Sequence, residues 1–138
     1  MEEFFMKEAL KLAMSAFEED EIPVGAVVVK DNEIIGRGYN QKEKYKNPLK
    51  HAELIAIEKA CNYIGDWRLN DCEIYVTLEP CNMCMGAIVE TRIKKITYGI
   101  SKEKQVFDNQ KDIEIYGGVL EQECLEILQK FFKNKRNK

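Results

Sequence analysis

The chain is 138 residues long, which suits one domain with a hydrophobic core and is too short for two ordinary domains. Hydrophobic residues make up 45% of the sequence and charged residues 33%, a normal balance for a globular protein. The formal net charge of −3 excludes the strongly basic composition of a dedicated nucleic-acid-binding domain. No apolar run is long enough to span a membrane, and the N-terminus lacks the basic start of a secretion signal, so we expect a soluble, cytoplasmic protein.

Hydrophobic periodicity predicts an alternation of helices and strands. Residues 2–18 carry apolar side chains at helical spacing, and 24–29 is a nearly all-apolar run, typical of a strand buried on both faces. Asn47 and Pro48 suit an N-cap and a first helical residue, so we expect a helix to begin there. In chain order, the sequence predicts a helix over 2–18, strands over 24–29 and 33–39, a helix over 47–64, a strand over 72–78, a helix over 81–91, a strand over 93–100, a short polar crossover over 101–111, a strand over 112–116 and a helix over 121–133.

This order predicts an α/β fold with three layers, in which one five-stranded sheet has helices on both faces. We expect a single domain over residues 1–138. The last helix is expected to turn four side chains inward, those of Cys124, Leu125, Leu128 and Phe132. Three of the five cysteines lie in apolar-patterned segments, and we expect them to be reduced core residues without a disulfide framework: Cys61, Cys72 and Cys124.

Two short motifs carry the chemistry: His51-Ala52-Glu53 and Pro80-Cys81-Asn82-Met83-Cys84. They supply one imidazole, two thiolates and one carboxylate. Zinc takes nitrogen and sulfur ligands in tetrahedral geometry, and three protein ligands leave the fourth position for water, as in a catalytic zinc site. His51 is the only histidine of the chain, so a zinc site that combines histidine with these cysteines must use it.

Helical geometry assigns different tasks to these residues. Cys81 and Cys84 are three positions apart and share a face in the first turn, where the positive end of the helix dipole lowers a thiol pKa. His51 and Glu53 are two positions apart and do not share a face. We therefore expect His51, Cys81 and Cys84 to bind one zinc ion, while Glu53 moves protons at the bound water.

Each motif has a plainer interpretation when it is taken alone. A Cys-x-x-Cys pair can be a redox pair or two buried thiols, and a single histidine is often an ordinary polar residue. A structural zinc ion in a binding module is a further alternative, but it would leave Glu53 without a purpose and the fourth zinc position unfilled. The joint occurrence of the two motifs, each at a helix start, favours the catalytic zinc site.

The two motifs together match the H-x-E and P-C-x-x-C signature of zinc-dependent base deaminases. Nearly the whole chain resembles the cytidine deaminase-like superfamily, and within it most closely the bacterial tRNA-specific adenosine deaminase branch. The likeness is carried by Ile22-Pro23-Val24-Gly25-Ala26, Gly36-Arg37-Gly38-Tyr39-Asn40, Asn47-Pro48-Leu49-Lys50-His51-Ala52-Glu53, Trp67-Arg68-Leu69, Thr77-Leu78-Glu79-Pro80-Cys81 and Phe131-Phe132-Lys133.

This resemblance implies a mixed sheet, one Zn²⁺ per chain and a hydrolase that converts the wobble adenosine of a tRNA to inosine. It implies that Glu53 takes a proton from the zinc-bound water and delivers it to the ring and to the leaving ammonia, and that Asn40 hydrogen-bonds the substrate nucleoside. It also implies a homodimer whose two subunits both touch the anticodon stem-loop.

One segment departs from the tRNA branch. Residues 101–109 contain no glycine, whereas the tRNA enzymes carry an Asp-x-Lys-x-Gly-Ala type of segment and a longer crossover. The short crossover and the acidic isoelectric point favour an alternative, deamination of a free nucleobase or nucleoside such as guanine, cytosine or a related ring. The basic tail favours RNA, and in that case we expect Lys133, Lys135 and Arg136 to contact phosphates.

Overall fold

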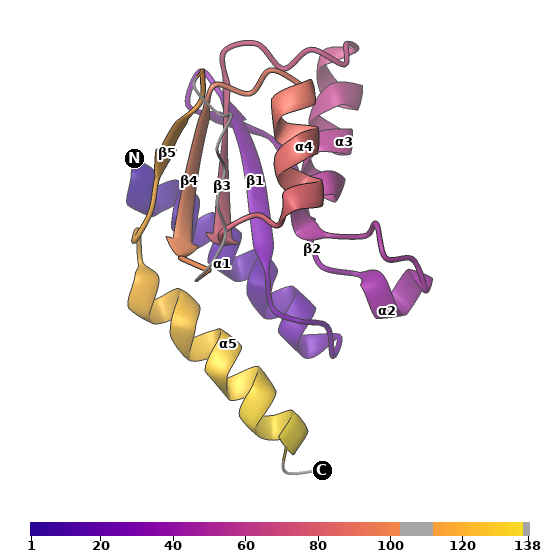
Figure 1. Ribbon diagram of the computed structural model, residues 1–138, viewed down its shortest axis with the longest axis vertical. Coiled ribbons are helices and arrows are strands. Elements are labelled where there is room, and N and C mark those ends of the chain that lie inside the picture. The colour runs from indigo at the N-terminus through magenta and orange to yellow at the C-terminus, as the bar shows by residue number, and fades with distance from the viewer. Residues whose placement is uncertain (103–111, 137–138) are drawn as a thin grey trace.

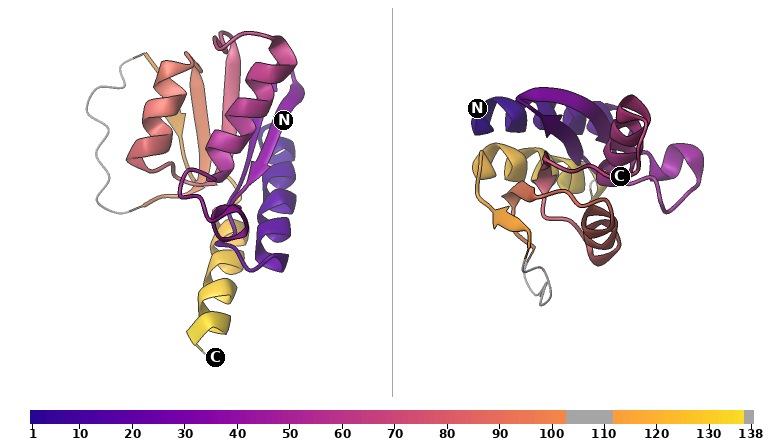
Figure 2. Two further views of the ribbon diagram at one scale, coloured as in Figure 1. Left: turned by 90° about the vertical axis from the view of Figure 1, so that its right-hand side faces the viewer. Right: turned by 90° about the horizontal axis from the view of Figure 1, so that it is seen from above.

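The computed structural model describes residues 1–102 and 112–136. Within these ranges the protein has one five-stranded sheet in the order β2-β1-β3-β4-β5, covered by helices on both faces (Figure 1 and Figure 2). The helices are α1 (Glu2–Glu18), α2 (Lys42–Tyr45), α3 (Ala52–Ile64), α4 (Asn82–Glu90) and α5 (Glu121–Arg136), and the strands are β1 (Gly25–Lys30), β2 (Glu33–Tyr39), β3 (Cys72–Leu78), β4 (Lys95–Ile100) and β5 (Glu114–Tyr116).

The predicted three-layer α/β fold with a mixed sheet is confirmed. Strand β1 runs antiparallel to β2 and β3, whereas β3, β4 and β5 are parallel to one another. The short helix α2 was not predicted. Most of the crossover predicted over 101–111 lies outside the described residues. No helix in the described part of the chain is long and apolar enough to cross a membrane.

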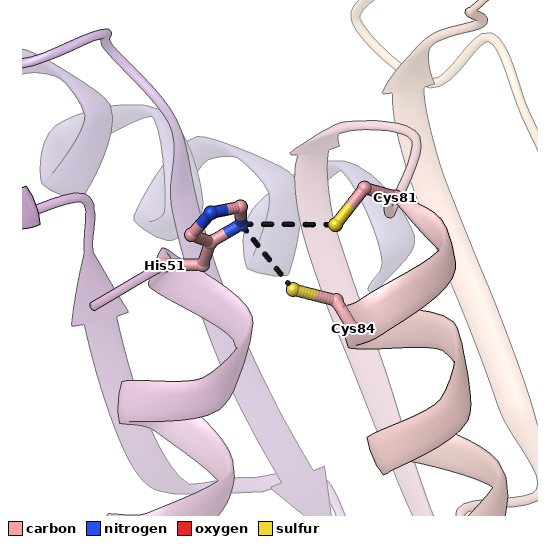
Figure 3. A group of neighbouring side chains, drawn as sticks. All are labelled: His51, Cys81 and Cys84. Atoms are coloured by element: carbon pink, nitrogen blue, oxygen red, sulfur yellow. Dashed lines mark hydrogen bonds between the residues drawn. The ribbon is translucent and has the colours of Figure 1, made fainter. Parts of the chain in front are cut away.

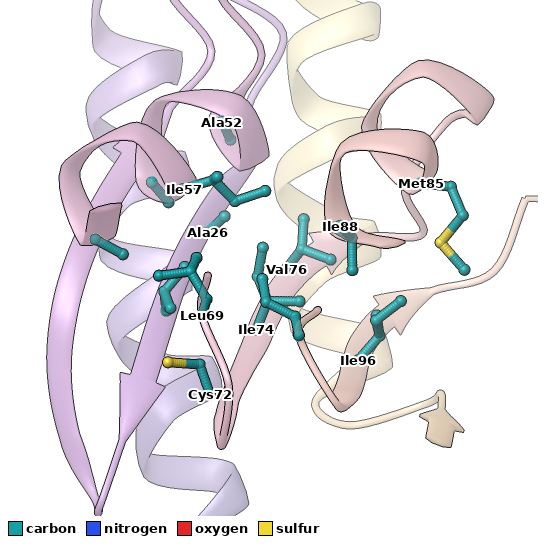
Figure 4. Packing of buried hydrophobic residues seen from close by; sticks show 14 of the residues in the cluster. Ala26, Ala52, Ile57, Leu69, Cys72, Ile74, Val76, Met85, Ile88 and Ile96 are labelled. Carbon is teal, nitrogen blue, oxygen red and sulfur yellow. The ribbon is translucent and has the colours of Figure 1, made fainter. Parts of the chain in front are cut away.

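Strand β1 is buried on both faces, as its apolar run predicts. Val27 and Val29 pack in the cluster that holds the inward face of α1, and Ala26 and Val28 pack in the cluster on the opposite side of the sheet. The second cluster joins α3, α4 and the sheet, and it is drawn in Figure 4. Helices α3 and α4, at whose starts the predicted metal ligands lie, therefore share one face of the sheet and one core.

Helix α3 begins later than the sequence predicts, and this correction matters for the site. Its first residue is Ala52 and its N-cap is His51, in an extended conformation with φ −82° and ψ 150°. Asn47 instead closes a tight turn, in which its Oδ1 accepts the N–H of Leu49 at 2.9 Å. Asparagine followed by proline suits a turn as well as a helix start, so the pattern alone does not distinguish them. His51 consequently sits at the helix entrance and not inside the first turn.

Helix α5 is rotated relative to the sequence expectation. Cys124 is buried as predicted, and Leu125 and Leu128 are half-buried, but Phe132 is 41% exposed. Ile127 and Phe131 take the inward positions, because Phe131 packs edge-on against Phe17 of α1 with ring centroids 6.2 Å apart. Adjacent phenylalanines are equally apolar, so only the neighbouring helix decides which of them is buried.

The cysteines agree with the sequence expectation. All five are free thiols, and those outside the motifs are buried or half-buried: Cys61, Cys72 and Cys124.

Two glycines of β2 allow α3 to lie directly on the sheet. A Cβ atom at Gly36 would lie 2.2 Å from the carbonyl oxygen of Ala56, and one at Gly38 would lie 2.4 Å from the carbonyl oxygen of Ala52. Any side chain at either position would push the helix outward, because carbon and oxygen atoms do not approach so closely. The Gly-x-Gly spacing thus sets the depth of α3, and with it the depth of the site residues at its start.

Candidate metal centre

Three side chains from two helix starts meet above the sheet. Cys81 is the N-cap of α4, Cys84 lies in its first turn and His51 is the N-cap of α3. The Nδ1 atom of His51 lies 3.8 Å from Sγ of Cys81 and 3.5 Å from Sγ of Cys84 (Figure 3). All three potential ligand atoms lie within 4.8 Å of one another. The starts of α3 and α4 therefore face each other across this cluster.

These distances fit a single zinc ion. In a tetrahedral site with Zn–S of about 2.3 Å and Zn–N of about 2.1 Å, a sulfur and a nitrogen ligand lie about 3.6 Å apart. The two observed separations, 3.5 and 3.8 Å, fall on either side of that value. In the described part of the chain no further side chain, whether histidine, cysteine or carboxylate, joins these three as a fourth potential ligand. The set therefore leaves one coordination position open.

The environment of His51 suits metal binding. Burial lowers the pKa of its imidazole, and the positive charges of Lys102 and Lys42 lower it further. The ring is therefore neutral near pH 7 and has a nitrogen lone pair for a metal ion.

The environment of Cys84 differs from the sequence expectation. Burial raises the pKa of this thiol, and the neighbouring Glu53 and Cys81 raise it further, so the helix start does not by itself make Cys84 a thiolate. The expected lowering is wrong for Cys84, because the sequence does not reveal how completely the side chain is buried. A metal ion must displace this thiol proton, so binding is coupled to proton release.

Glu53 lies beside the cluster and not in it. It belongs to the first turn of α3, is only 4% exposed and lines the same cavity as His51 and Cys81. Burial raises the pKa of its carboxyl group, while the positive charge of Lys102 acts in the opposite direction. A raised pKa makes this carboxylate a stronger proton acceptor than an exposed glutamate, which suits a general acid–base group.

Asn40 follows β2 and connects the two sides of the cavity. Its Oδ1 accepts the N–H of Ala52 at 2.8 Å, one of the donors left free at the start of α3, and its Nδ2 donates to the carbonyl oxygen of Ile22 at 3.0 Å. The side chain lines the cavity and keeps a second N–H for a ligand. Asn40 therefore positions α3 and presents a hydrogen-bond donor at the same time.

The cavity next to His51, Cys81 and Cys84 has a volume of about 710 Å³. Apolar side chains of Val24 and Leu78 line it together with His51, Glu53 and Asn40. A concave, partly apolar site with a few converging polar groups is typical of pockets that bind small ring systems.

Comparison with known proteins identifies the family. The family model described as MafB19-like deaminase matches residues 1–136. The chain belongs to this deaminase family.

Relatives and solved structures agree with that assignment and with the resemblance seen in the motifs. The tRNA-specific adenosine deaminase of Bacillus subtilis (strain 168) is 41% identical, over 99% of this chain and 92% of the relative. A solved tRNA:A34 deaminase, studied for A-to-I editing at the wobble position of transfer RNA, superposes with a TM-score of 0.85 at 38% identity, over 91% of this chain and 99% of that one. A guanine deaminase from Bacillus subtilis has a TM-score of 0.68 and 42% identity, over 72% of this chain and 64% of that one.

The C-terminal helix brings part of the basic tail to the cavity of this deaminase. Phe131 and Lys135 line the cavity, and the Nζ atom of Lys135 lies 2.6 Å from a carboxylate oxygen of Asp20. Lys133 and Arg136 lie apart, on a second hollow formed along α5 itself. The three basic residues named from the sequence are thus close in the chain but divided between two surfaces.

Two buried carboxylates at the cavity were not recognised from the sequence. Glu21 is 2% exposed and accepts the backbone N–H groups of Glu43 and Lys44 at 3.0 and 2.8 Å, which fixes α2 at the rim. Glu79 is 8% exposed and holds the chain that leaves β4. Glu79 could have been suspected from its place directly before Pro80 and Cys81, but nothing distinguishes Glu21 within its acidic run.

Proposed function

We propose that this deaminase is a zinc-dependent hydrolase that converts adenosine to inosine in tRNA, at the wobble position of an anticodon. The observation that carries the proposal is the open His51, Cys81 and Cys84 cluster with the buried carboxyl group of Glu53 beside it, at one cavity. The choice of substrate is supported by relatives of the tRNA-specific adenosine deaminase type that match nearly the whole chain.

In this proposal His51, Cys81 and Cys84 hold one Zn²⁺, and Glu53 is the catalytic acid–base group. Zinc, when bound there, lowers the pKa of a coordinated water from about 15.7 toward about 7. Glu53 accepts one proton from the attacking water and gives it to a ring nitrogen. It then accepts the second proton of that water, from the hydroxyl group formed on the ring carbon, and gives it to the amino group, which leaves as ammonia when the C–N bond breaks. The balanced reaction consumes one water and releases one ammonia for each adenosine converted to inosine.

Asn40 orients the substrate in this proposal. Asn40 lines the cavity, and its bonds to Ala52 and Ile22 hold the amide in one orientation. A donor that is fixed before the substrate arrives loses little entropy on binding, so it contributes to positioning as well as affinity.

We further propose that the partner is the anticodon stem-loop of a tRNA, that residues 1–138 form one deaminase domain, and that the protein is a cytoplasmic homodimer. The match of the family model to residues 1–136 supports the single domain. The basic side chains at the rim and on α5 support a phosphate-bearing partner. Light scattering on the purified protein tests the dimer directly.

Deamination of a free base is the second candidate. It is supported by the solved guanine deaminase at 42% identity, although that match spans only 72% of this chain and 64% of its own. A free base has no phosphate, so this candidate leaves the lysines among the acidic and basic residues of the cavity lining without an anionic ligand.

One substrate comparison decides between the two candidates. The zinc-loaded protein is incubated with an anticodon stem-loop that has adenosine at the first anticodon position, with the same stem-loop carrying guanosine there, and separately with guanine, cytosine and adenosine. We expect inosine from the first substrate alone. A Glu53→Gln preparation, purified in the same way, controls for contaminating deaminases. Release of ammonia from a free base, with the stem-loop unchanged, would replace the RNA proposal by the second candidate.

A further inference from the structure

The buried carboxylate of Glu79 anchors the chain that leaves β4 beside the candidate metal site. The Oε1 atom of Glu79 accepts the hydroxyl of Ser101 at 3.1 Å and the backbone N–H of Lys102 at 2.8 Å. The backbone N–H of Glu79 in turn donates to the carbonyl oxygen of Ile100 at 2.8 Å. The end of β4 is thus tied to the segment that leads directly into Cys81, and the position of Lys102 relative to the site is fixed by three hydrogen bonds.

The side chain of Lys102 belongs to the cavity wall. It is half-buried and lines the cavity together with His51, Glu53 and Cys81.

Two other lysines of the wall have carboxylate partners, whereas Lys42, like Lys102, has none within the described residues. Lys44 lies 3.8 Å from a carboxylate oxygen of Glu19, and Lys135 lies 2.6 Å from one of Asp20. Within residues 1–102 and 112–136, no carboxylate forms an ion pair with Lys102. The carboxylate of Glu79 accepts the hydroxyl of Ser101 and the backbone N–H of Lys102, but it forms no ion pair with the Lys102 ammonium group. Lys102 is half-buried and has no carboxylate partner in the described part of the chain, and such a lysine favours an anionic ligand.

We propose that Lys102 binds a phosphate group that flanks the target nucleoside, and thereby favours a nucleotide within RNA over a free base. This inference rests on the proposed function. A nucleotide within a chain brings a phosphate on each side of its sugar to the cavity mouth, whereas a base or nucleoside brings none. Lys102 supplies a point charge with three N–H donors, which suits a phosphate oxygen. It is a substrate-binding residue and takes no part in moving protons.

The test combines a charge removed from the protein with a charge removed from the RNA. Lys102→Met keeps the length of the side chain but removes the ammonium group. Lys94→Met is the matched control, because Lys94 is exposed and precedes β4 at the end of the strand opposite to Lys102. In the stem-loop, the phosphates on the 5′ and 3′ sides of the target adenosine are replaced one at a time by neutral methylphosphonate.

We expect Lys102→Met to lower kcat/KM for the stem-loop by about tenfold or more, as for loss of a charged hydrogen bond. The slope of log kcat/KM against log salt should become shallower by about 0.7–1, the value for one lost phosphate contact. Lys102→Arg should restore most of both, and Lys94→Met should behave as the wild type. One of the two methylphosphonates should impair the wild-type protein but have no further effect on Lys102→Met, because both changes remove the same contact.

The outcomes separate this inference from the proposed function. Wild-type protein that fails to deaminate the stem-loop overturns the proposed function, and the phosphate contact with it. Wild-type protein that is active, combined with methylphosphonate losses that simply add to the loss in Lys102→Met, overturns the phosphate contact alone. An unchanged salt slope in an active, zinc-loaded Lys102→Met protein leads to the same conclusion.

Discussion

Gly38→Ala should damage the site without touching any of its residues. The new Cβ would lie 2.4 Å from the carbonyl oxygen of Ala52 and 2.7 Å from the backbone nitrogen of Ala56. Ordinary contacts begin at about 3.5 Å, so the start of α3 must move outward by about 1 Å. Overpacking of this kind costs about 1–3 kcal/mol of unfolding free energy, and the lower chain entropy of alanine offsets only about 0.4–1 kcal/mol.

The displacement reaches the chemistry because Ala52 lies between His51 and Glu53. A misplacement of about 1 Å can lower the rate about 10²-fold. We therefore expect a melting temperature lower by several degrees, at roughly 3 °C per kcal/mol for a chain of this size, and a fall in kcat that exceeds the fraction of protein unfolded. Calorimetry and deamination of the stem-loop, both with the zinc content measured, give the two quantities.

Gly86→Ala is the matched control for Gly38→Ala. A Cβ at Gly86 meets no atom within 4 Å, and the residue lies inside α4. The same substitution should therefore stabilise the protein by about 0.5–1 kcal/mol through helix propensity. If Gly38→Ala melts and turns over like the wild type, α3 is not held against β2 as closely as the structure describes.

Other substitutions test the metal centre and the partner. Cys84→Ala should release zinc and activity together, since two ligands do not hold a catalytic zinc ion, and full zinc in a folded variant by elemental analysis would contradict the ligand assignment. Glu53→Gln should keep zinc and melt normally while deamination falls by about 10²–10⁴-fold, and a near-normal rate would exclude Glu53 as the proton carrier. Replacement of Lys133, Lys135 and Arg136 by Ala should weaken stem-loop deamination and flatten its salt dependence, whereas an unaltered slope would argue against phosphate contacts by the tail.

Local sequence patterns determine most of the elements of this deaminase. The all-apolar run of β1 predicts a strand because a strand covered by helices on both faces of its sheet is apolar throughout. The metal ligands could also be predicted from the sequence, because Cys81 and Cys84 share a face of one helix and His51 is the only histidine. These inferences depend on residue identity and spacing along the chain, which the sequence states directly.

Tertiary structure decided the features that depend on neighbours distant in the chain. The start of α3 lies at Ala52 because Asn47 closes a turn and Asn40 caps the helix from another segment. Burial raises the pKa of Cys84 where helix position alone predicted the opposite, since desolvation depends on everything packed around the thiol. The roles of Glu79 and Lys102 likewise emerge only when the ends of β3 and β4 lie side by side, because a carboxylate has no defined partner until the fold brings one within hydrogen-bonding distance.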